Sequence, residues 1–369
     1  MARIVRAQLT LVTLRPLVAR SDAIQSFESQ ETPILTLTDS DGASGTGYTY
    51  TIGTGGSSIA SLLRDHLLPR LIGADANGIE RIWRELYFSV HALAVGPITS
   101  LALAAIDTAL WDLRCTRADL PLWQVAGGAQ ERVPLYSTEG GWLHLPAAAL
   151  VEDALVKKDA GFFGTKLKVG KPSPHEDFDR LSDVRAAVGP DWDIMVDANQ
   201  AFRYDDAIRR ASGFSGLDLA WFEEPMPADD VAGHAQLARA TPIPIAVGES
   251  LYSLSQFREY LQAGACSVVQ VDVARIGGVT PWLKVAHLAE SYNVSVAPHF
   301  LMELHVSLAC AIPNGARLEY IPQLDPITES RLTMKGGYAY PPSAPGLGVQ
   351  WDWPEIAKQG EALPDVVAP

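Results

Sequence analysis

From residue 133 onward, short apolar runs alternate with longer segments in which apolar residues recur at helical spacing. Short apolar runs between turn residues predict buried strands, and the longer periodic segments predict helices. The expected strands are 133–137, 164–169, 193–197, 220–223, 245–249, 268–273, 295–298 and 317–320. The expected helices are 146–160, 175–188, 204–213, 231–240, 253–263, 280–292 and 303–312. This alternation of eight strands with helices predicts an α/β fold with a closed parallel barrel.

The chain before residue 126 has a different pattern. Alternating apolar and polar residues predict antiparallel strands at 3–12, 32–37 and 45–50, and helical periodicity follows at 57–71, 79–88 and 97–114. Strands followed by helices indicate a separate α+β domain, in which the alanine-rich stretch 101–113 packs between other elements. The polar segment 20–31 is long for a hairpin loop, so we expect it to be a lid.

Three of the predicted barrel strands end in an acid. Asp197, Glu223 and Glu249 follow apolar runs and are spaced 26 residues apart. The carboxyl ends of barrel strands meet at one rim, where three carboxylates would repel each other without a cation between them. Because oxygen ligands without Cys or His favour Mg²⁺ over Zn²⁺, the pattern predicts a magnesium site.

Other polar residues fall at or near the same strand ends. Lys166 and Lys168 lie two residues apart in one strand and therefore share a face. Asp272, His299 and Glu319 lie at the ends of the sixth, seventh and eighth strands. We therefore expect two lysines, a histidine and further acids around the three carboxylates.

These dispersed positions together resemble the mandelate racemase subgroup of the enolase superfamily. The resemblance rests on Lys166-x-Lys168, Asp197-Ala-Asn199, Glu223-Glu-Pro225, Gly248-Glu249, the pair of Asp272 and His299, and Glu319. It implies a (β/α)7β modified TIM barrel with an N-terminal α+β capping domain that the C-terminal segment completes. The expected boundaries are 1–125 for the capping domain, 126–322 for the barrel and 323–369 for the returning segment. The stretch 297–305 is more similar to the acid-sugar dehydratases of this subgroup than to mandelate racemase itself.

The resemblance also implies roles for single residues. Asp197, Glu223 and Glu249 would bind Mg²⁺, and Lys168 and His299 would act as bases on opposite faces of the substrate, with Asp272 holding the His299 ring. Lys166 would neutralise the substrate carboxylate, and Glu319, protonated or sharing a proton, would donate to that carboxylate. We expect Lys166 and the Mg²⁺ ion to lower the pKa of Lys168. The expected substrate contacts are Lys166, Asn199, Glu319, Arg20 of the lid and His305.

Such a site favours dehydration of an acid sugar, an aldonate or aldarate, to a 2-keto-3-deoxy acid through a metal-stabilised enediolate. The polar lid suits a polyhydroxylated substrate better than an aromatic one. Racemisation or epimerisation of a 2-hydroxy acid is the first alternative, and cycloisomerisation of a sugar acid is another. A non-catalytic binding protein is a remote alternative, because such a descendant is expected to lose a base or a metal ligand and none is missing.

The composition limits the classes of partner that we expect. The formal net charge is −14 and no block of Lys or Arg occurs, so we expect no nucleic acid and no membrane partner. The three cysteines, Cys115, Cys266 and Cys310, form no paired motif, and the charged N-terminus is unlike a signal peptide. A cytoplasmic enzyme with a small carboxylate substrate is the expectation, and relatives of this kind suggest a homo-oligomer such as an octamer.

Overall fold

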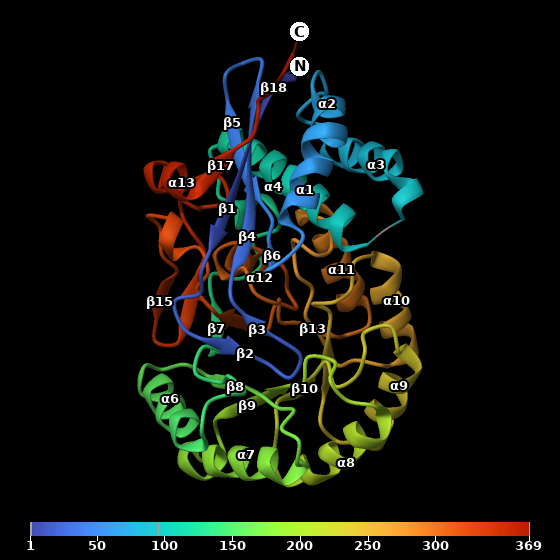
Figure 1. The fold of residues 1–369 in the computed structure, drawn as a ribbon, viewed down its shortest axis with the longest axis vertical. Helices are drawn as coiled ribbons and strands as arrows, with labels where there is room; N and C mark the ends of the chain where they lie inside the picture. Colours follow the sequence, from blue (N-terminus) through green and yellow to red (C-terminus); the bar gives the residue numbers. More distant parts are fainter. Residues whose placement is uncertain (1, 95, 369) are drawn as a thin grey trace.

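The computed structural model describes residues 2–94 and 96–368. An antiparallel sheet with its helices lies over one end of a parallel barrel (Figure 1). The sheet is built on β1 (Ile4–Leu14), β4 (Gln30–Asp39) and β5 (Ser44–Tyr48), and β6 (Thr51–Ile52) pairs with β4. These strands agree with the antiparallel strands expected from the alternating pattern, since one face of each is buried.

Helices cover one side of this sheet. They are α1 (Gly56–Leu62), a π-helical turn (Leu63–Leu67), α2 (Leu68–Leu71), α3 (Ile79–Ser89), α4 (Pro97–Ala118) and α5 (Leu122–Val125). A Cβ atom at Gly47 of β5 would lie only 2.2 Å from the backbone nitrogen of Ala109, so glycine lets α4 lie directly on the strand. This contact confirms that the alanine-rich stretch packs between elements.

The barrel is the (β/α)7β arrangement predicted above. Its strands are β7 (Val133–Ser137), β8 (Gly164–Lys168), β9 (Asp193–Asp197), β10 (Trp221–Glu223), β11 (Ile245–Val247), β12 (Val268–Val269), β13 (Ser295–Val296) and β14 (Leu318–Tyr320). The helices between them are α6 (Ala147–Asp159), α7 (Pro174–Val188), α8 (Tyr204–Phe214), α9 (Val231–Ala240), α10 (Leu254–Ala263), α11 (Val279–Ser291) and α12 (Met302–Ala311).

The strands pair in parallel in the order β14, β7, β8, β9, β10, β11, β12, β13. Val296 closes the ring, because its nitrogen donates to Asn314 O at 2.9 Å and its oxygen accepts from Ala316 N at 2.8 Å. Side chains fill the interior below the rim, as in other barrels of this type. This inner cluster consists of Tyr136, Met195, Trp221, Ala246, Val268 and Ala297.

The C-terminal segment returns to the capping sheet, as expected. Strands β17 (Gly360–Ala362) and β18 (Val366–Val367) pair antiparallel with β1, and α13 (Trp353–Gln359) packs beside them. One part of the segment, residues 333–340, pairs with the barrel and not with the capping sheet. The hairpin of β15 (Thr333–Lys335) and β16 (Tyr338–Tyr340), which the sequence pattern did not reveal, pairs with β7 at the barrel.

The segment 20–31 forms a small hairpin over the barrel end. Its strands are β2 (Arg20–Ser21) and β3 (Ser26–Phe27), and Leu143 N donates to Ser21 O at 3.0 Å. This placement fits the expected lid. Within the described ranges, no helix combines the length and the apolar character that crossing a bilayer requires.

Candidate active site

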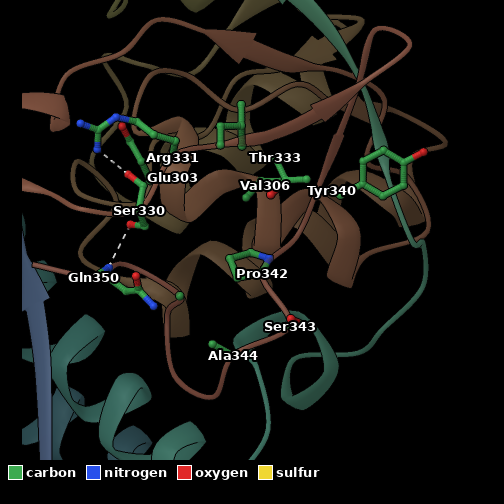
Figure 2. A pocket seen from close by; sticks show the side chains of 12 residues that line it. Glu303, Val306, Ser330, Arg331, Thr333, Tyr340, Pro342, Ser343, Ala344 and Gln350 are labelled. Atoms are coloured by element: carbon green, nitrogen blue, oxygen red, sulfur yellow. Dashed lines mark hydrogen bonds between the residues drawn. The ribbon is translucent and has the colours of Figure 1, made fainter.

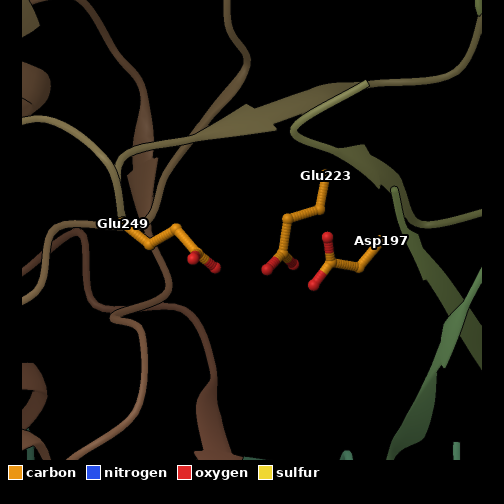
Figure 3. A group of neighbouring side chains, drawn as sticks. All are labelled: Asp197, Glu223 and Glu249. Atoms are coloured by element: carbon orange, nitrogen blue, oxygen red, sulfur yellow. The ribbon is translucent and has the colours of Figure 1, made fainter. Parts of the chain in front are cut away.

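The three predicted acids meet at the carboxyl ends of neighbouring strands. Asp197 and Glu223 end β9 and β10, and Glu249 lies two residues after β11. Each side chain offers an oxygen within 4.8 Å of the others, and all three residues are buried (Figure 3). Buried carboxylates this close to one another need a cation, and three hard oxygen ligands fit Mg²⁺. The geometry therefore suits the metal site expected from the sequence.

Lys166 lies among these acids. Its Nζ is 2.7 Å from Glu223 Oε1, 2.9 Å from Glu319 Oε1 and 3.7 Å from Asp197 Oδ2. Burial lowers the pKa of Lys166, but the carboxylates of Glu223 and Glu319 outweigh burial and hold its pKa well above the usual value. The side chain is thus a fixed positive charge at the rim.

Lys168 forms a direct ion pair with one of the three acids. Its ammonium donates to Asp197 Oδ2 and, at 2.9 Å, to Asn199 Oδ1. Burial lowers the pKa of Lys168, yet the negative charge of Asp197 outweighs burial, so the pKa is raised and not lowered. The expected lowering concerns the site with Mg²⁺ bound to Asp197, and it stays a prediction.

His299 is held from both sides of its ring. Its Nδ1 lies 2.9 Å from Asp272 Oδ2, and its Nε2 lies 3.3 Å from Glu249 Oε2. The hydroxyl of Tyr50 donates to the same Asp272 oxygen at 2.7 Å. Burial raises the pKa of Asp272, but the hydrogen bond to His299 and the His299 charge outweigh it and bring the pKa to about 2. Asp272 is therefore an ionised partner that fixes the ring.

Glu319 accepts hydrogen bonds on both of its carboxylate oxygens. Its Oε1 accepts from Thr138 Oγ1 at 2.6 Å, and its Oε2 accepts from Phe300 N at 2.8 Å. Burial raises the pKa of Glu319, but the Lys166 ammonium reverses this effect and lowers the pKa far below the usual range. Because every neighbour at hydrogen-bonding distance is a donor, the ionised form is favoured.

The structure does not bring Arg20 and His305 into the cavity at the rim. The guanidinium of Arg20 pairs with Glu139 and donates to Gln323 Oε1 at 2.7 Å, so it anchors the lid instead. His305 is fully buried, with Nε2 accepting from Val273 N at 3.1 Å and Nδ1 bonded to Phe300 O at 2.8 Å. Neither of these two expected substrate contacts therefore lines the rim cavity.

A small cavity of about 30 Å³ lies between the rim and the lid. Its lining includes the predicted residues Lys166, Lys168, Asn199, Glu249, His299 and Glu319. It also includes Gln25 and Phe27 of the expected lid, together with residues that sequence reasoning missed, namely Ile52, Thr138, Trp142, Arg275, Phe300 and Ile321. The missed residues do not end an apolar run as the three acids do, so no sequence pattern indicated that they line the site.

A second cavity, of about 250 Å³, lies between α12 and the C-terminal segment (Figure 2). Glu303, Arg331 and Tyr340 are among its lining side chains. None of the predicted catalytic or metal-binding residues belongs to its described lining. The chemistry-bearing residues thus gather at the barrel rim.

Comparison with known proteins agrees with this site. Residues 5–127 match the mandelate racemase / muconate lactonizing enzyme N-terminal domain, and residues 147–356 match the enolase C-terminal domain-like family. The chain belongs to the enolase superfamily, in its mandelate racemase and muconate lactonizing enzyme group. It is therefore an enzyme, and its cofactor is Mg²⁺.

Two relatives that are similar to this chain in sequence are named as enzymes of sugar acids. The chain is 36% identical over 315 residues to the L-talarate/galactarate dehydratase of Salmonella typhimurium, covering 85% of this chain and 79% of the relative. It is 38% identical over 324 residues to the 3,6-anhydro-α-L-galactonate cycloisomerase of Streptomyces coelicolor, covering 87% and 89%. A crystal structure of the Salmonella dehydratase with Mg and L-lyxarohydroxamate superposes with a TM-score of 0.95 at 33% identity, covering 100% of this chain and 95% of that one.

Proposed function

We propose that this enzyme is a lyase that dehydrates an acid sugar to a 2-keto-3-deoxy acid. The observation that supports this most is the placement of Lys168 and His299 on β8 and beyond β13, across the rim from each other. Two groups able to carry protons thus border one cavity next to the three acids. Dehydration needs one group to remove the C2 proton and one to protonate the departing C3 hydroxyl.

The rim residues would bind the reacting end of the substrate. Lys166 supplies a fixed positive charge for the substrate carboxylate, and the Glu319 carboxylate keeps that lysine charged and oriented. Mg²⁺ held by Asp197, Glu223 and Glu249 would supply further positive charge where negative charge develops as the proton leaves. Together these charges offset the weak acidity of a proton beside a carboxylate.

The elimination follows from the two proton carriers. One of Lys168 and His299 accepts the C2 proton, and the other donates a proton to the C3 hydroxyl, so the C2–H and C3–O bonds break and water leaves. The resulting enol then takes up a proton at C3 and becomes the 2-keto acid. Asp272 keeps a proton on His299 Nδ1, which leaves Nε2 on the cavity side for proton transfer.

The same two groups would also support isomerisation of a 2-hydroxy acid, since a proton removed on one face can return on the other. The similarity to a cycloisomerase makes this group of reactions the second candidate. In that case no water leaves and no 2-keto acid forms. Product analysis therefore distinguishes the two reactions.

The test is a panel of aldonates and aldarates incubated with the enzyme and Mg²⁺, with the 2-keto acid measured as its semicarbazone. We expect product from one or a few stereoisomers. Lys168→Ala and His299→Asn should each abolish turnover while retaining α-proton exchange in D₂O on the face of the remaining group. A panel without product, together with racemisation of a simple 2-hydroxy acid, would refute the dehydratase assignment.

A further inference from the structure

The two oxygens of the Glu223 carboxylate have different surroundings. Oε2 accepts from Gln270 Nε2 at 2.6 Å and from Trp221 Nε1 at 3.0 Å, whereas Oε1 accepts from Lys166 Nζ at 2.7 Å. Each carboxylate oxygen has two lone pairs. Both lone pairs of Oε2 therefore have a donor, while Oε1 has one donor among the described residues and keeps a lone pair for another partner.

Oε1 is also the oxygen on the side of the other acids. The Lys166 ammonium that binds Oε1 lies 3.7 Å from Asp197 Oδ2, so these two oxygens face the same space. Figure 3 shows Glu223 between Asp197 and Glu249. Oε2, in contrast, is turned to donors below the rim, since Trp221 belongs to the inner cluster of the barrel.

The two donors to Oε2 are held rigidly. Trp221 lies two residues before Glu223 on β10, so both side chains are on the inner face of that strand. Its ring meets Tyr136 edge-on, with centroids 5.3 Å apart. Gln270 follows β12, and its backbone nitrogen donates to Val247 O of β11 at 2.8 Å. Both donors are almost completely buried, which fixes the direction of their N–H groups.

Packing alone does not account for Gln270. Its side-chain oxygen is buried and has no hydrogen-bond partner among the described residues. A buried acceptor without a donor is costly, so an apolar side chain would suit a purely structural position better. The one hydrogen bond that the described side-chain amide makes is the bond to Glu223. Holding Glu223 is therefore the contribution that the structure shows for this residue.

Glu223 differs in this respect from Asp197 and Glu249. Each oxygen of those two acids has a single donor at hydrogen-bonding distance among the described residues. These donors are Asn199 N and Lys168 Nζ for Asp197, and Arg275 Nη1 and His299 Nε2 for Glu249. Of the three acids, Glu223 is thus the one with an oxygen fully occupied by the protein.

We propose that Gln270 and Trp221 are positioning residues that leave Glu223 one oxygen for a metal ion and so make the site select Mg²⁺ over Ca²⁺. Ca²⁺ takes about six to eight oxygen ligands and readily uses both oxygens of one carboxylate, whereas the smaller Mg²⁺ requires a regular set of six. Occupying Oε2 withholds the second oxygen from Ca²⁺ and removes nothing that Mg²⁺ needs. Partners of metal ligands commonly set affinity in this way.

The test is calorimetric titration of the metal-free enzyme with MgCl₂ and with CaCl₂. It needs no substrate, so its result is independent of the dehydratase proposal. Gln270→Met approximately keeps the length of the side chain and removes the donor. We expect Mg²⁺ affinity to fall about 10- to 100-fold and Ca²⁺ affinity to fall less or to rise, so that the preference for Mg²⁺ decreases about tenfold or more. Trp221→Phe, which keeps an aromatic ring beside Tyr136, should change the preference in the same direction.

Gln130→Met is the matched control. Gln130 Nε2 donates to Ile312 O at 3.0 Å and to Gly315 O at 2.8 Å, before the start of β14 and at the opposite end of the barrel from the acids. This variant should lower the free energy of unfolding in urea and leave both ion affinities unchanged.

An unchanged ratio of Mg²⁺ to Ca²⁺ affinity in folded Gln270→Met would overturn the inference, whether both ions bind as before or both are weakened equally. Circular dichroism and urea unfolding establish that the variant is folded. If it does not fold, the same criterion applies to Trp221→Phe. A loss of preference in Gln130→Met as large as that in Gln270→Met would also overturn the inference, because the effect would then come from a general loosening of the barrel.

Discussion

Tyr50 offers the sharpest test of how the capping domain contributes to catalysis. Its hydroxyl donates to Asp272 Oδ2, the oxygen that also binds His299 Nδ1. Its ring stacks on Phe300, with centroids 4.8 Å apart, and Phe300 stacks on His299 at 5.2 Å. Tyr50→Phe removes the hydroxyl and keeps both aromatic contacts. We predict that this variant loses activity because the Asp272 carboxylate is no longer held in place.

The size of the effect follows from the bonds that remain. A hydrogen bond to a charged group contributes about 1.5–3 kcal/mol. After the substitution Asp272 still accepts from His299, from Ala274 N at 2.8 Å and from Arg275 N at 3.1 Å, so it stays ionised but is less restrained. If the lost energy appears mainly in the step that uses His299, kcat should fall by about 10- to 100-fold. KM should change little, because Tyr50 Oη is bonded to Asp272 and not to the rim groups that bind the substrate carboxylate.

Two measurements distinguish positioning from general damage. Steady-state rates of 2-keto acid formation give the separate changes in kcat and KM. Proton exchange in D₂O reports each face, and exchange on the His299 face should slow while exchange on the Lys168 face is retained. Tyr48→Phe is the control, since the Tyr48 hydroxyl is buried without a partner among the described residues and its loss should be neutral or stabilising.

The reasoning is refuted if Tyr50→Phe matches the unaltered enzyme in kcat. It is also refuted if exchange slows equally on both faces, because that result would mean a general loosening of the site. A rise in KM alone would assign Tyr50 to substrate binding and not to the Asp272–His299 pair.

Three further outcomes are expected. Removing Mg²⁺ with EDTA should abolish activity reversibly, and Asp197→Asn should lower kcat/KM about 1000-fold or more, with weaker Mg²⁺ binding in calorimetry. Gly47→Ala should cost about 3 kcal/mol or more in urea unfolding, since its Cβ would meet the α4 backbone, whereas Gly213→Ala, with open space around it in α8, should gain about 0.5–1 kcal/mol. Burial lowers the pKa of His305 in the folded chain to about 4. As the pH falls below 6.5, His305 therefore binds a proton in the unfolded chain before it does so in the folded chain. Stability should therefore drop by about 3 kcal/mol between pH 6.5 and pH 4, and His305→Gln should flatten that slope; an unchanged slope would contradict the assignment.

The parts of the site that the sequence predicted correctly are those with a local signature. An apolar run that ends in an acid marks both a buried strand and the position of its carboxyl end, which is why Asp197, Glu223 and Glu249 were found together. Barrel geometry then brings such ends to one rim without any knowledge of side-chain contacts. The hydrogen-bond donors of Glu319 could not be predicted in this way, because they come from distant segments. Thr138, for example, lies 181 residues before it.

The strand β12 shows a similar limit. The apolar run predicted a strand through residue 273, but the ladder ends at Val269. Asp272 Oδ1 accepts from the backbone nitrogens of Ala274 and Arg275 and turns the chain there. Such a local turn competes with strand pairing, and the hydrophobic pattern of the sequence does not reveal it. The roles assigned to individual side chains and the exact domain boundaries stay predictions.

The pairing of β17 and β18 with β1 has a consequence for the order of folding. Thr10 lies opposite Ala362, and Arg6 lies opposite Val367, so one edge of the capping sheet is completed by residues made after the entire barrel. During synthesis β1 is an open strand edge for as long as the barrel takes to emerge from the ribosome. Open edges invite pairing with other chains. A chain cut short before residue 360 is therefore expected to aggregate through β1 even though its catalytic rim is intact.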